Sequence, residues 1–551
     1  MDSAVLSLLG AFVLSIIGLF VFIWSMRRGL LVENPGAASV IFARGEIGRV
    51  DDPALAGDAQ RSMQHAASAR HGDEPPPSAD PAEIADRIAA DRSTSFPVFM
   101  FIAFACFWLL IGSAAGLVAS IKLHEPDWLV NEAWLTFGRI RTVHLNAVIY
   151  GWSSNGCLAI ILWLLPRLLR TPLRGAQWTM LGGTFINAGI AAGIGAIAAG
   201  WSDGMEFLEI PWQISIFIFA GFALIILPVL VTLVNRKVEH LYVSVWYMVA
   251  ALLWIALLFF VAKLPGVHTG VQQATTNWWY GHNALGLWFT PVSVGAIYYF
   301  LPKIIGRPVR SYNLSLLGFW TLAFFYGQVG GHHLIGGPVP GWLTTLSIVQ
   351  SVMMVIPVIA FTINQAGTLR GHMHLARYSP TLRFMMFGGL MYLASSLQGS
   401  AEALRSVNAV THFTHFTVAH AHLGMYAFVA MVLFGAIYFM LPRVLNWEWP
   451  YPGLITLHFW LVAVGIGIYF VGLTIGGWLQ GTAMLDAARP FMESVAVTLP
   501  YLKWRSLGGA LMTLGHLVFV GHFFAMALRF GPQRTGAALF WQPQIGAAHG
   551  K

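Results

Sequence analysis

The sequence predicts an all-α, polytopic membrane protein. Of the 551 residues, 57% are hydrophobic and only 10% are charged, whereas soluble domains carry about 25% charged residues. Apolar runs of roughly 20 residues, enough to cross a hydrocarbon core, recur along the whole chain. The basic residues gather between these runs, so the formal net charge of +8 indicates loops at one membrane face and not nucleic-acid binding.

About thirteen runs qualify as spans, one N-terminal and twelve forming a core. The first run is not a signal peptide, because it lacks a basic start and the arginines of "SMRRGLL" follow it in place of a cleavage site. No clear internal repeat is visible. The spans lie near residues 4–25, 95–121, 143–166, 177–200, 210–235, 241–263, 279–302, 313–331, 342–364, 382–399, 418–442, 455–477 and 506–530.

The basic residues predict the orientation and the division of the chain. The arginines after the first span place that end in the cytoplasm, and from there every strongly basic loop falls on the same side. The N-terminus is therefore expected outside and the C-terminus inside. The predicted segments are a single-span helix at 1–50, a polar cytoplasmic linker at 51–93 with a short helix at 81–91, a twelve-span domain at 94–535 and a tail at 536–551.

Six histidines fall at one depth, near the outer ends of four spans: His144, His282, His332, His333, His420 and His422. Successive helix residues turn by about 100°, so His420 and His422 point to nearly opposite faces and one helix could bind two groups. His332 and His333 could join His282 around one ion, and three imidazoles suit copper or zinc. Single imidazoles from separate helices suit haem iron. Ionisable groups inside spans are costly and usually functional, which favours a cofactor layer over hydrogen-bonded core residues.

At these residues the chain resembles the catalytic subunit of heme-copper oxidases, and most of all that of the cbb3-type cytochrome c oxidases. The resemblance covers about residues 95–530 and implies a twelve-helix oxidase core. It rests on "GRIRTVHLNAVIYGW", "NWWYGHNALG", "YYFLPK", "GFWTLAFFYGQVGGHH" and "SVNAVTHFTHFTVAHAHLG".

The resemblance implies two b-type haems and one copper ion. His144 and His422 would be the axial ligands of the low-spin haem, and His420 the proximal ligand of the high-spin haem. The copper would be held by His282, His332 and His333.

Tyr326 is the expected reactive side chain, six and seven residues before the paired histidines. In the cbb3 family the matching tyrosine is covalently joined to the copper ligand that aligns with His282. It supplies an electron and a proton when the O–O bond breaks. Simple packing within the span is the alternative.

Protons for this chemistry would come from the cytoplasm, along positions that match the single proton channel of the family. These are Thr290, Tyr298, Tyr312 and Ser315, ending at Tyr326. Hydroxyl groups can both give and take a proton. The alternative is that each hydroxyl bonds a carbonyl one turn back.

Five further residues are expected near the haem propionates, and three of them, His412, Asn408 and Glu206, match family positions there. Arg139 and Arg141 would suit a propionate or, alternatively, the membrane interface. His412 and Asn408 precede the eleventh span. Glu206 aligns with a family carboxylate that holds a calcium ion beside the propionates, although calcium takes six to eight oxygens.

The chain departs from the family at three places. Gln398 stands where the family has a glutamate near the active site, and Glu402, four residues on, shares its helical face. Gly318 replaces a histidine, and His415 replaces an aspartate. These changes affect proton input and not the metal ligands.

The implied partners are c-type cytochrome subunits and a cytochrome c donor, because no CxxCH motif is present. The resemblance thus implies, as the first candidate, a terminal respiratory oxidase that reduces O₂ to water and couples this reaction to proton translocation. Membrane lipid would be its surroundings and a bacterial inner membrane its location. The first ~50 residues resemble the small single-span cbb3 maturation protein, and a plain anchor helix is the alternative. A nitric oxide reductase, with iron in place of copper, is the second candidate, and a transporter or maturation protein without cofactors is the third.

Overall fold

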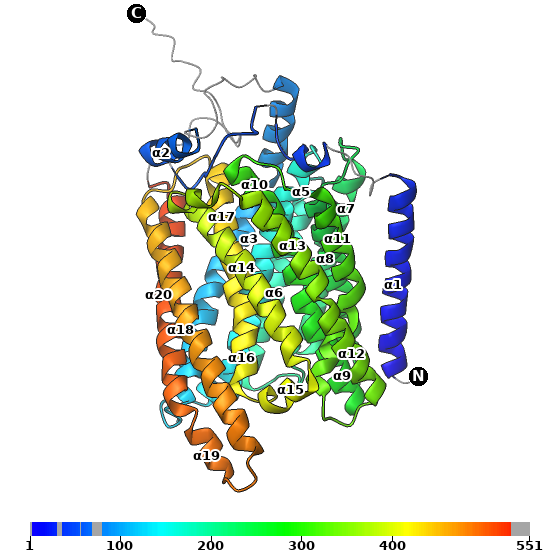
Figure 1. Cartoon of the computed structure of the whole chain (residues 1–551), viewed down its shortest axis with the longest axis vertical. Coiled ribbons are helices and arrows are strands. Elements are labelled where there is room, and N and C mark those ends of the chain that lie inside the picture. The colour runs from blue at the N-terminus through cyan, green and yellow to red at the C-terminus, as the bar shows by residue number, and fades with distance from the viewer. Residues whose placement is uncertain (1–2, 30–35, 44, 56, 69–79, 531–551) are drawn as a thin grey trace, which may run out of the picture.

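The computed structural model describes residues 3–29, 36–43, 45–55, 57–68 and 80–530. These residues form helices and no strand, so the predicted all-α class is confirmed. Most of the helices run side by side in one long bundle (Figure 1). The predicted tail at 536–551 lies outside the described residues.

Each predicted span corresponds to one helix or to two or more consecutive helical segments. Ten stretches among the described residues are long and apolar enough to cross a membrane. Two other core helices, α11 and α14, are shorter or less apolar but run inside the same bundle (Figure 1). The long helices are α1 (Ser3–Arg27), α3 (Pro81–Lys122), α4 (Phe137–Asn146), α5 (Ser154–Leu168), α6 (Ala176–Ala199), α7 (Trp212–Val234), α8 (Val243–Ala262), α9 (Val271–Asn283), α10 (Thr290–Ile305), α11 (Tyr312–Phe325), α12 (Gly341–Met353), α13 (Val355–Leu369), α14 (Pro380–Glu402), α16 (His415–His422), α17 (Met431–Leu445), α18 (Pro452–Leu485) and α20 (Leu499–Ala527).

Shorter helical segments complete the chain. The short α-helices are α2 (Gly57–Ser68), α15 (Arg405–Thr411) and α19 (Phe491–Ala496). The 3₁₀ segments are η1 (Ala37–Ser39), η2 (Ala133–Leu135), η5 (Tyr326–Leu334) and η6 (Met373–Arg377). The π-helical segments are η3 (Ala147–Ser153), η4 (Ala284–Phe289) and η7 (Leu423–Ala430).

Three central stretches share a pattern that the sequence analysis missed. They are Phe137–Leu168, Val271–Ile305 and His415–Leu445. An 18-residue apolar stretch of each is 94%, 89% and 83% buried, respectively. Each has a histidine shortly before a π-helical segment and carries leucine, proline and a basic residue in its last turns. The basic residues are Arg167, Lys303 and Arg443. The core therefore contains an internal repeat, whose sequence signal is "LLPR", "FLPK" and "MLPR".

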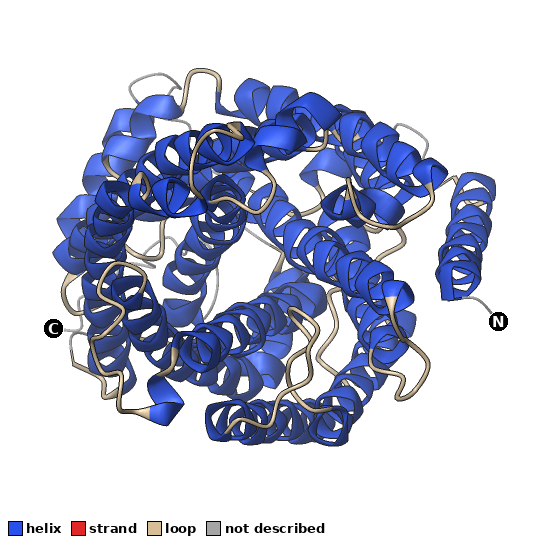
Figure 2. Cartoon of the chain, turned by 90° about the horizontal axis from the view of Figure 1, so that it is seen from below, coloured by secondary structure: helices blue, strands red, loops and turns tan. Residues whose placement is uncertain are grey.

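The bundle has two distinct ends. One end carries α2 and the segment that we call the arm, residues 36–68, described except for 44 and 56 (Figure 1). The first residues of α1 lie at the opposite end, and α1 stands apart at the edge of the bundle (Figures 1 and 2). We call the first the arm end. We call the second the histidine end, because α9 and α16, which carry His282, His420 and His422, lie toward it (Figure 1).

The first core helix is longer than the sequence predicted. α3 begins at Pro81, where Asp80 caps it by accepting a bond from the Ala82 amide at 2.9 Å. The predicted short helix at 81–91 is thus continuous with the span at 95–121, despite Pro97 inside it. The predicted linker at 51–93 therefore includes the start of this helix.

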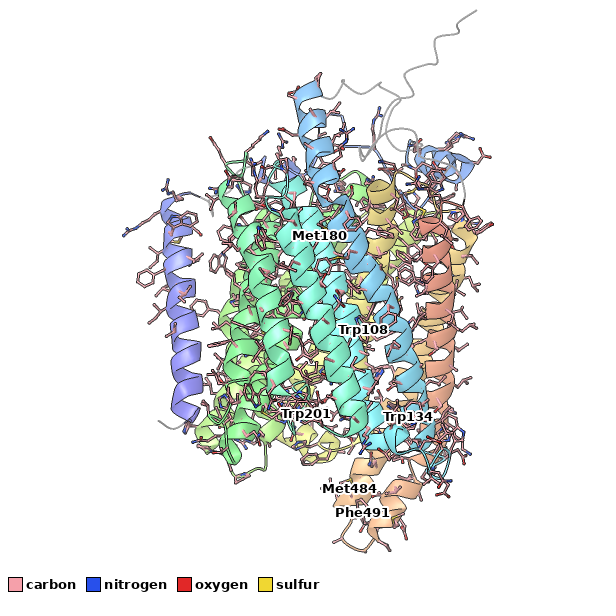
Figure 3. The ribbon with its side chains drawn as sticks, turned by 180° about the vertical axis from the view of Figure 1, so that it is seen from behind. Trp108, Trp134, Met180, Trp201, Met484 and Phe491 are labelled. Carbon is pink, nitrogen blue, oxygen red and sulfur yellow. The ribbon has the colours of Figure 1, made fainter. Side chains whose placement is uncertain are left out.

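Exposed aromatic and apolar side chains mark the histidine end. Trp134 and Trp201 are 54% and 52% exposed there (Figure 3). Tryptophan is enriched at membrane–water boundaries. The end of α18 and all of α19 project beyond the other helices, as the positions of Met484 and Phe491 show (Figure 3).

Candidate functional site

Three histidines converge between α9 and η5, at the histidine end. The ring nitrogens that His282, His332 and His333 can offer all lie within 4.8 Å of one another. Within the described parts of the chain, no other group of three or more His, Cys, Asp or Glu side chains converges in this way. Metal–imidazole bonds measure about 2.0–2.1 Å, so a single ion is within reach of all three rings after small rotations.

Their hydrogen bonds leave nitrogens free for a metal. Ser351 donates its own proton to the Ser347 carbonyl at 2.7 Å, so its oxygen must accept from Nδ1 of His332 at 2.9 Å. Nε2 of His332 then carries the lone pair that a metal needs. His333 stacks on Trp278 at 4.0 Å between ring centroids. Nδ1 of His282 is buried without a hydrogen-bond partner.

Tyr326 lies beside this cluster. Its ring centroid is 5.4 Å from that of His282, at an interplanar angle of 47°. The approach depends on Gly286, one turn after His282 on the same helix, because a Cβ at that position would overlap the tyrosine ring. The rings of Tyr326 and His282 can therefore lie this close because residue 286 has no side chain.

A second histidine pair joins α4 to α16. The rings of His144 and His422 are parallel to within 7°, with centroids 6.4 Å apart. Their Nδ1 atoms bond the carbonyls of Gly112 at 2.7 Å and Val418 at 2.9 Å. A carbonyl only accepts, so Nδ1 carries the proton and Nε2 is available. Two metal–imidazole bonds of about 2.0–2.1 Å, one on each side of a single ion, fit between the rings.

A cavity lies around this pair, with about 1030 Å³ of space free of protein atoms, part of it open to the outside. That is the size of a large ligand site. Its walls are mainly apolar, and Arg505 of α20 adds a guanidinium. The Tyr469 hydroxyl accepts from Nε of Arg505 at 3.1 Å and lies 3.1 Å from Nε2 of His422. The sequence analysis missed both side chains, since each lies far along the chain from the histidine motifs.

His420 faces a different neighbour from His422, as the helical turn predicts. Its Nδ1 is 3.8 Å from a carboxylate oxygen of Glu402 and has no hydrogen bond. Glu402 is buried, and the side-chain oxygen of Gln398, one turn earlier, is buried without a partner. A carboxylate beside a ligating histidine is a common way to orient the ring and raise its basicity.

The π-helical segments lie directly after these histidines. η3 begins three residues after His144, η4 two after His282 and η7 one after His422. Such segments are rare and are frequently found at functional sites. The irregular turns therefore coincide with the candidate ligands on all three central helices.

Three hydroxyl groups of the predicted proton path contact backbone carbonyls and not one another. The hydroxyls of Ser315 and Thr290 bond the carbonyls of Tyr312 at 2.5 Å and Leu285 at 3.0 Å, which is the alternative stated above. The Tyr298 hydroxyl is buried without a hydrogen bond of good geometry. Tyr312 contacts the carbonyl of Leu241 and Nε2 of His240, both at 3.0 Å.

His240 is a further residue that the sequence analysis missed. It is half-buried in the loop between α7 and α8 at the arm end, and burial lowers its pKa. Its contact with Tyr312 connects the first predicted hydroxyl to the surface.

The predicted propionate residues have other partners. Arg141 forms an ion pair with Glu206 at 2.5 Å, and Arg139 bonds the Ala198 carbonyl at 3.2 Å. Glu206 does not belong to a converging group of three or more acidic, histidine or cysteine side chains among the described residues. His412 and Asn408 line another cavity, near Ile335, and burial lowers the pKa of His412.

Comparisons with known proteins identify relatives of the chain. Residues 97–511 match the family described as Cytochrome C and Quinol oxidase polypeptide I. The chain is 33% identical over 440 residues to a Cbb3-type cytochrome c oxidase subunit CcoN1 of Stutzerimonas stutzeri, covering 76% of this chain and 92% of that one. It is 31% identical over 497 residues to a Cytochrome c oxidase subunit 1 homolog, bacteroid, of Bradyrhizobium diazoefficiens, covering 85% and 88%.

Two more distant similarities complete the comparison. A nitric oxide reductase polypeptide of Stutzerimonas stutzeri is 24% identical over 470 residues, covering 78% of this chain and 94% of that one. A cryo-EM structure of a heme-copper terminal oxidase dimer superposes with a TM-score of 0.67 at 17% identity, covering 83% and 87%. This superposition shows a shared fold.

Proposed function

Because the chain belongs to the cytochrome c and quinol oxidase polypeptide I family of heme-copper oxidases, we propose that it reduces O₂ to water at a haem–copper pair. Each O₂ takes up four electrons and four protons and yields two water molecules. The family implies haem and copper, and the finer assignments below are proposals. The observation that supports them best is the convergence of His282, His332 and His333 beside Tyr326.

The proposed ligands follow from the geometry. His282, His332 and His333 would hold the copper, whose nearby haem would be bound by His420. His144 and His422 would grip the second b-type haem from both sides. The unprotonated Nε2 atoms, of which that of His422 is contacted by the Tyr469 hydroxyl, the parallel rings and the apolar cavity support this assignment. When bound, these groups supply electrons to O₂ and a place for it to bind.

The protein's own residues would manage protons and orientation. The Tyr326 hydroxyl would hold the proton delivered nearest the reacting oxygen. His240, Tyr312 and Tyr298 would pass protons from the arm end, with water between them, while Ser315 and Thr290 contribute only if their carbonyl bonds open. Glu402 would orient His420 and take the place of the glutamate that Gln398 replaces.

The remaining sequence predictions are part of the same proposal. The chain is an integral membrane protein, and we propose the bacterial inner membrane with the histidine end facing the periplasm. c-Type cytochrome subunits and a cytochrome c would supply electrons, since the chain has no CxxCH motif. Calcium at Glu206 has weak support, because Arg141 neutralises that carboxylate. The arm end would face the cytoplasm.

Nitric oxide reduction is the second candidate, because a reductase polypeptide also aligns with most of this chain. Metal analysis of the purified protein separates the two. About one copper per two haems supports the oxidase, and a third iron without copper supports the reductase.

The direct test of the oxidase is Tyr326→Phe, which removes one hydroxyl and leaves the ring in place. We expect both haems to bind, with an unchanged reduced-minus-oxidised spectrum, and O₂ consumption to fall by at least about 100-fold, the scale of a lost proton donor. Tyr451→Phe, at an exposed position, is the matched control. Turnover within twofold of the unsubstituted protein would refute the role of Tyr326.

A further inference from the structure

The arm lies outside the residues that match the family, which begin at residue 97. It is nevertheless packed into the core of the molecule. Several apolar side chains of this segment are buried, as expected for a folded part of the protein and not for a solvated linker. The buried side chains are Ala37, Ile41, Phe42, Val50, Ala54, Leu55 and Met63. The arm is therefore an ordered element of the fold.

The arm packs over the ends of two of the three repeats. Arg167, Lys303 and Arg443 each follow a proline in the last turn of a central helix, and their side chains are only 3%, 1% and 1% exposed. Three buried cations at equivalent positions would be costly unless each had an anionic partner. We call this group the basic socket.

Carboxylates from the N-terminal part of the chain neutralise the basic socket. Lys303 pairs with Glu46, and Arg443 pairs with Asp51, both at 2.6 Å. Arg167 pairs with Asp91 near the start of α3. Two of the three repeats thus receive their carboxylate from the arm.

Lys303 is enclosed by the arm on several sides. Its ammonium also donates to the Ile41 carbonyl at 3.0 Å and lies 4.8 Å from the centre of the Phe42 ring. Glu46 in turn accepts a bond from Arg87 of α3 at 2.9 Å. The same carboxylate therefore connects α3 to α10.

Backbone bonds hold the acidic residues in register with the repeat ends. The amide of Gly48 donates to the Gly306 carbonyl at 2.7 Å, and the amide of Asp51 donates to the Ile304 carbonyl at 3.0 Å. Gly306 has a positive φ of 66° and no room for a side chain, because a Cβ would overlap the Arg49 backbone. The loop after α10 is thus shaped to receive the backbone of residues 48–51.

We propose that the basic socket is a carboxylate-binding site and that the arm is its intramolecular ligand, joining the ends of two of the three repeats at the arm end while Asp91 of α3 neutralises the third. Glu46 and Asp51 are the recognition residues. The backbone pairing at Gly306 sets which carboxylate meets which cation. The proposal concerns residues outside the candidate redox site and does not depend on the proposed oxidase activity.

The test is the full-length double variant Glu46→Gln/Asp51→Asn, which removes two charges and keeps the side-chain shapes. Hydrogen exchange of residues 36–68, followed by mass spectrometry, reports whether the arm stays bound. We expect exchange at least about tenfold faster, because breaking a buried pair leaves an unmatched charge. Asp58→Asn is the matched control, since this arm carboxylate is 92% exposed and its loss should change nothing.

If the double variant does not fold, a second pair of variants that exchanges the two charges tests the same proposal. Asp51→Arg alone should release the arm, and adding Arg443→Asp should restore slow exchange to within about twofold, because this pair, unlike Glu46–Lys303, does not share its carboxylate with Arg87. Arm exchange at the unsubstituted rate in the double variant would overturn the proposal. So would a charge exchange that restores nothing while the spectrum shows a folded protein, since packing without charge recognition would then hold the arm.

Discussion

Replacing Gly286 by alanine tests the arrangement of Tyr326 and His282 with a single methyl group. The three ring atoms of Tyr326 nearest to the added Cβ would all be closer than 2.5 Å, whereas ordinary contact begins at 3.4 Å. The ring must therefore move by more than about 1 Å to restore ordinary contact. A misplacement of about 1 Å at a reacting group can reduce the rate by about 100-fold.

The backbone itself should tolerate the substitution. Alanine is a better helix former than glycine by roughly 0.5–1 kcal/mol, so any loss would come from the displaced ring and not from a weaker helix. Gly389→Ala is the matched control, because its nearest neighbour atom would be 3.7 Å from the new Cβ.

The assay compares haem content with O₂ consumption. We expect Gly286→Ala to keep both haems and lose about 100-fold in turnover, while Gly389→Ala keeps both properties. If Gly286→Ala consumes O₂ at more than half the original rate, the position of the Tyr326 ring does not control the reaction and our assignment of this tyrosine is wrong.

Three further predictions concern other parts of the molecule. Glu402→Gln should lower turnover by about 10–100-fold, the usual cost of losing a carboxylate that orients a ligating histidine; Glu239→Gln, at an exposed site, should not, and equal rates would exclude that role. His144→Leu should remove one of two haems and leave the copper content unchanged, as pyridine haemochrome and metal assays would show; retention of both haems would contradict the ligand assignment. Burial alone would raise the pKa of Glu46, but Lys303 and Arg87 lower it from 4.5 to about 2. This carboxylate therefore stabilises the fold above pH 4.5 and loses that contribution, of the order of 3 kcal/mol, as the pH falls toward 2. Thermal unfolding at pH 7 and pH 3 should accordingly show a larger acid-induced fall for the unsubstituted protein than for Glu46→Gln, and identical falls would refute this.

The spans could be predicted because a long apolar run in a membrane has few alternatives to a helix. The internal repeat was equally visible in principle, as three copies of leucine, proline and a basic residue. It was missed because each copy is short and lies well over 100 residues from the next. The depth of the six histidines also followed from the span count, and the structure brings five of them into two groups while His420 faces Glu402.

Other parts of the site depend on contacts between distant segments. Arg505 and Tyr469 reach the cavity beside His422 from α20 and α18, which contain none of the six histidines that the sequence analysis singled out. The sequence analysis divided the arm between the single-span segment at 1–50 and the polar linker at 51–93, because its buried side chains are spaced irregularly. Its order comes from carboxylates that meet cations more than 250 residues away, as in the Glu46–Lys303 pair, and no local pattern predicts such a pair.

The π-helical segments have a consequence for the phase of the central helices. A wider turn accommodates one residue more than a regular turn, and one residue corresponds to about 100° of rotation. Each central helix thus shifts its facing direction between its histidine and its terminal cation. Deleting one residue within η3, η4 or η7 would return the helix to regular winding and swing the histidine ring away by about a quarter turn, although every side chain of the site would still be present.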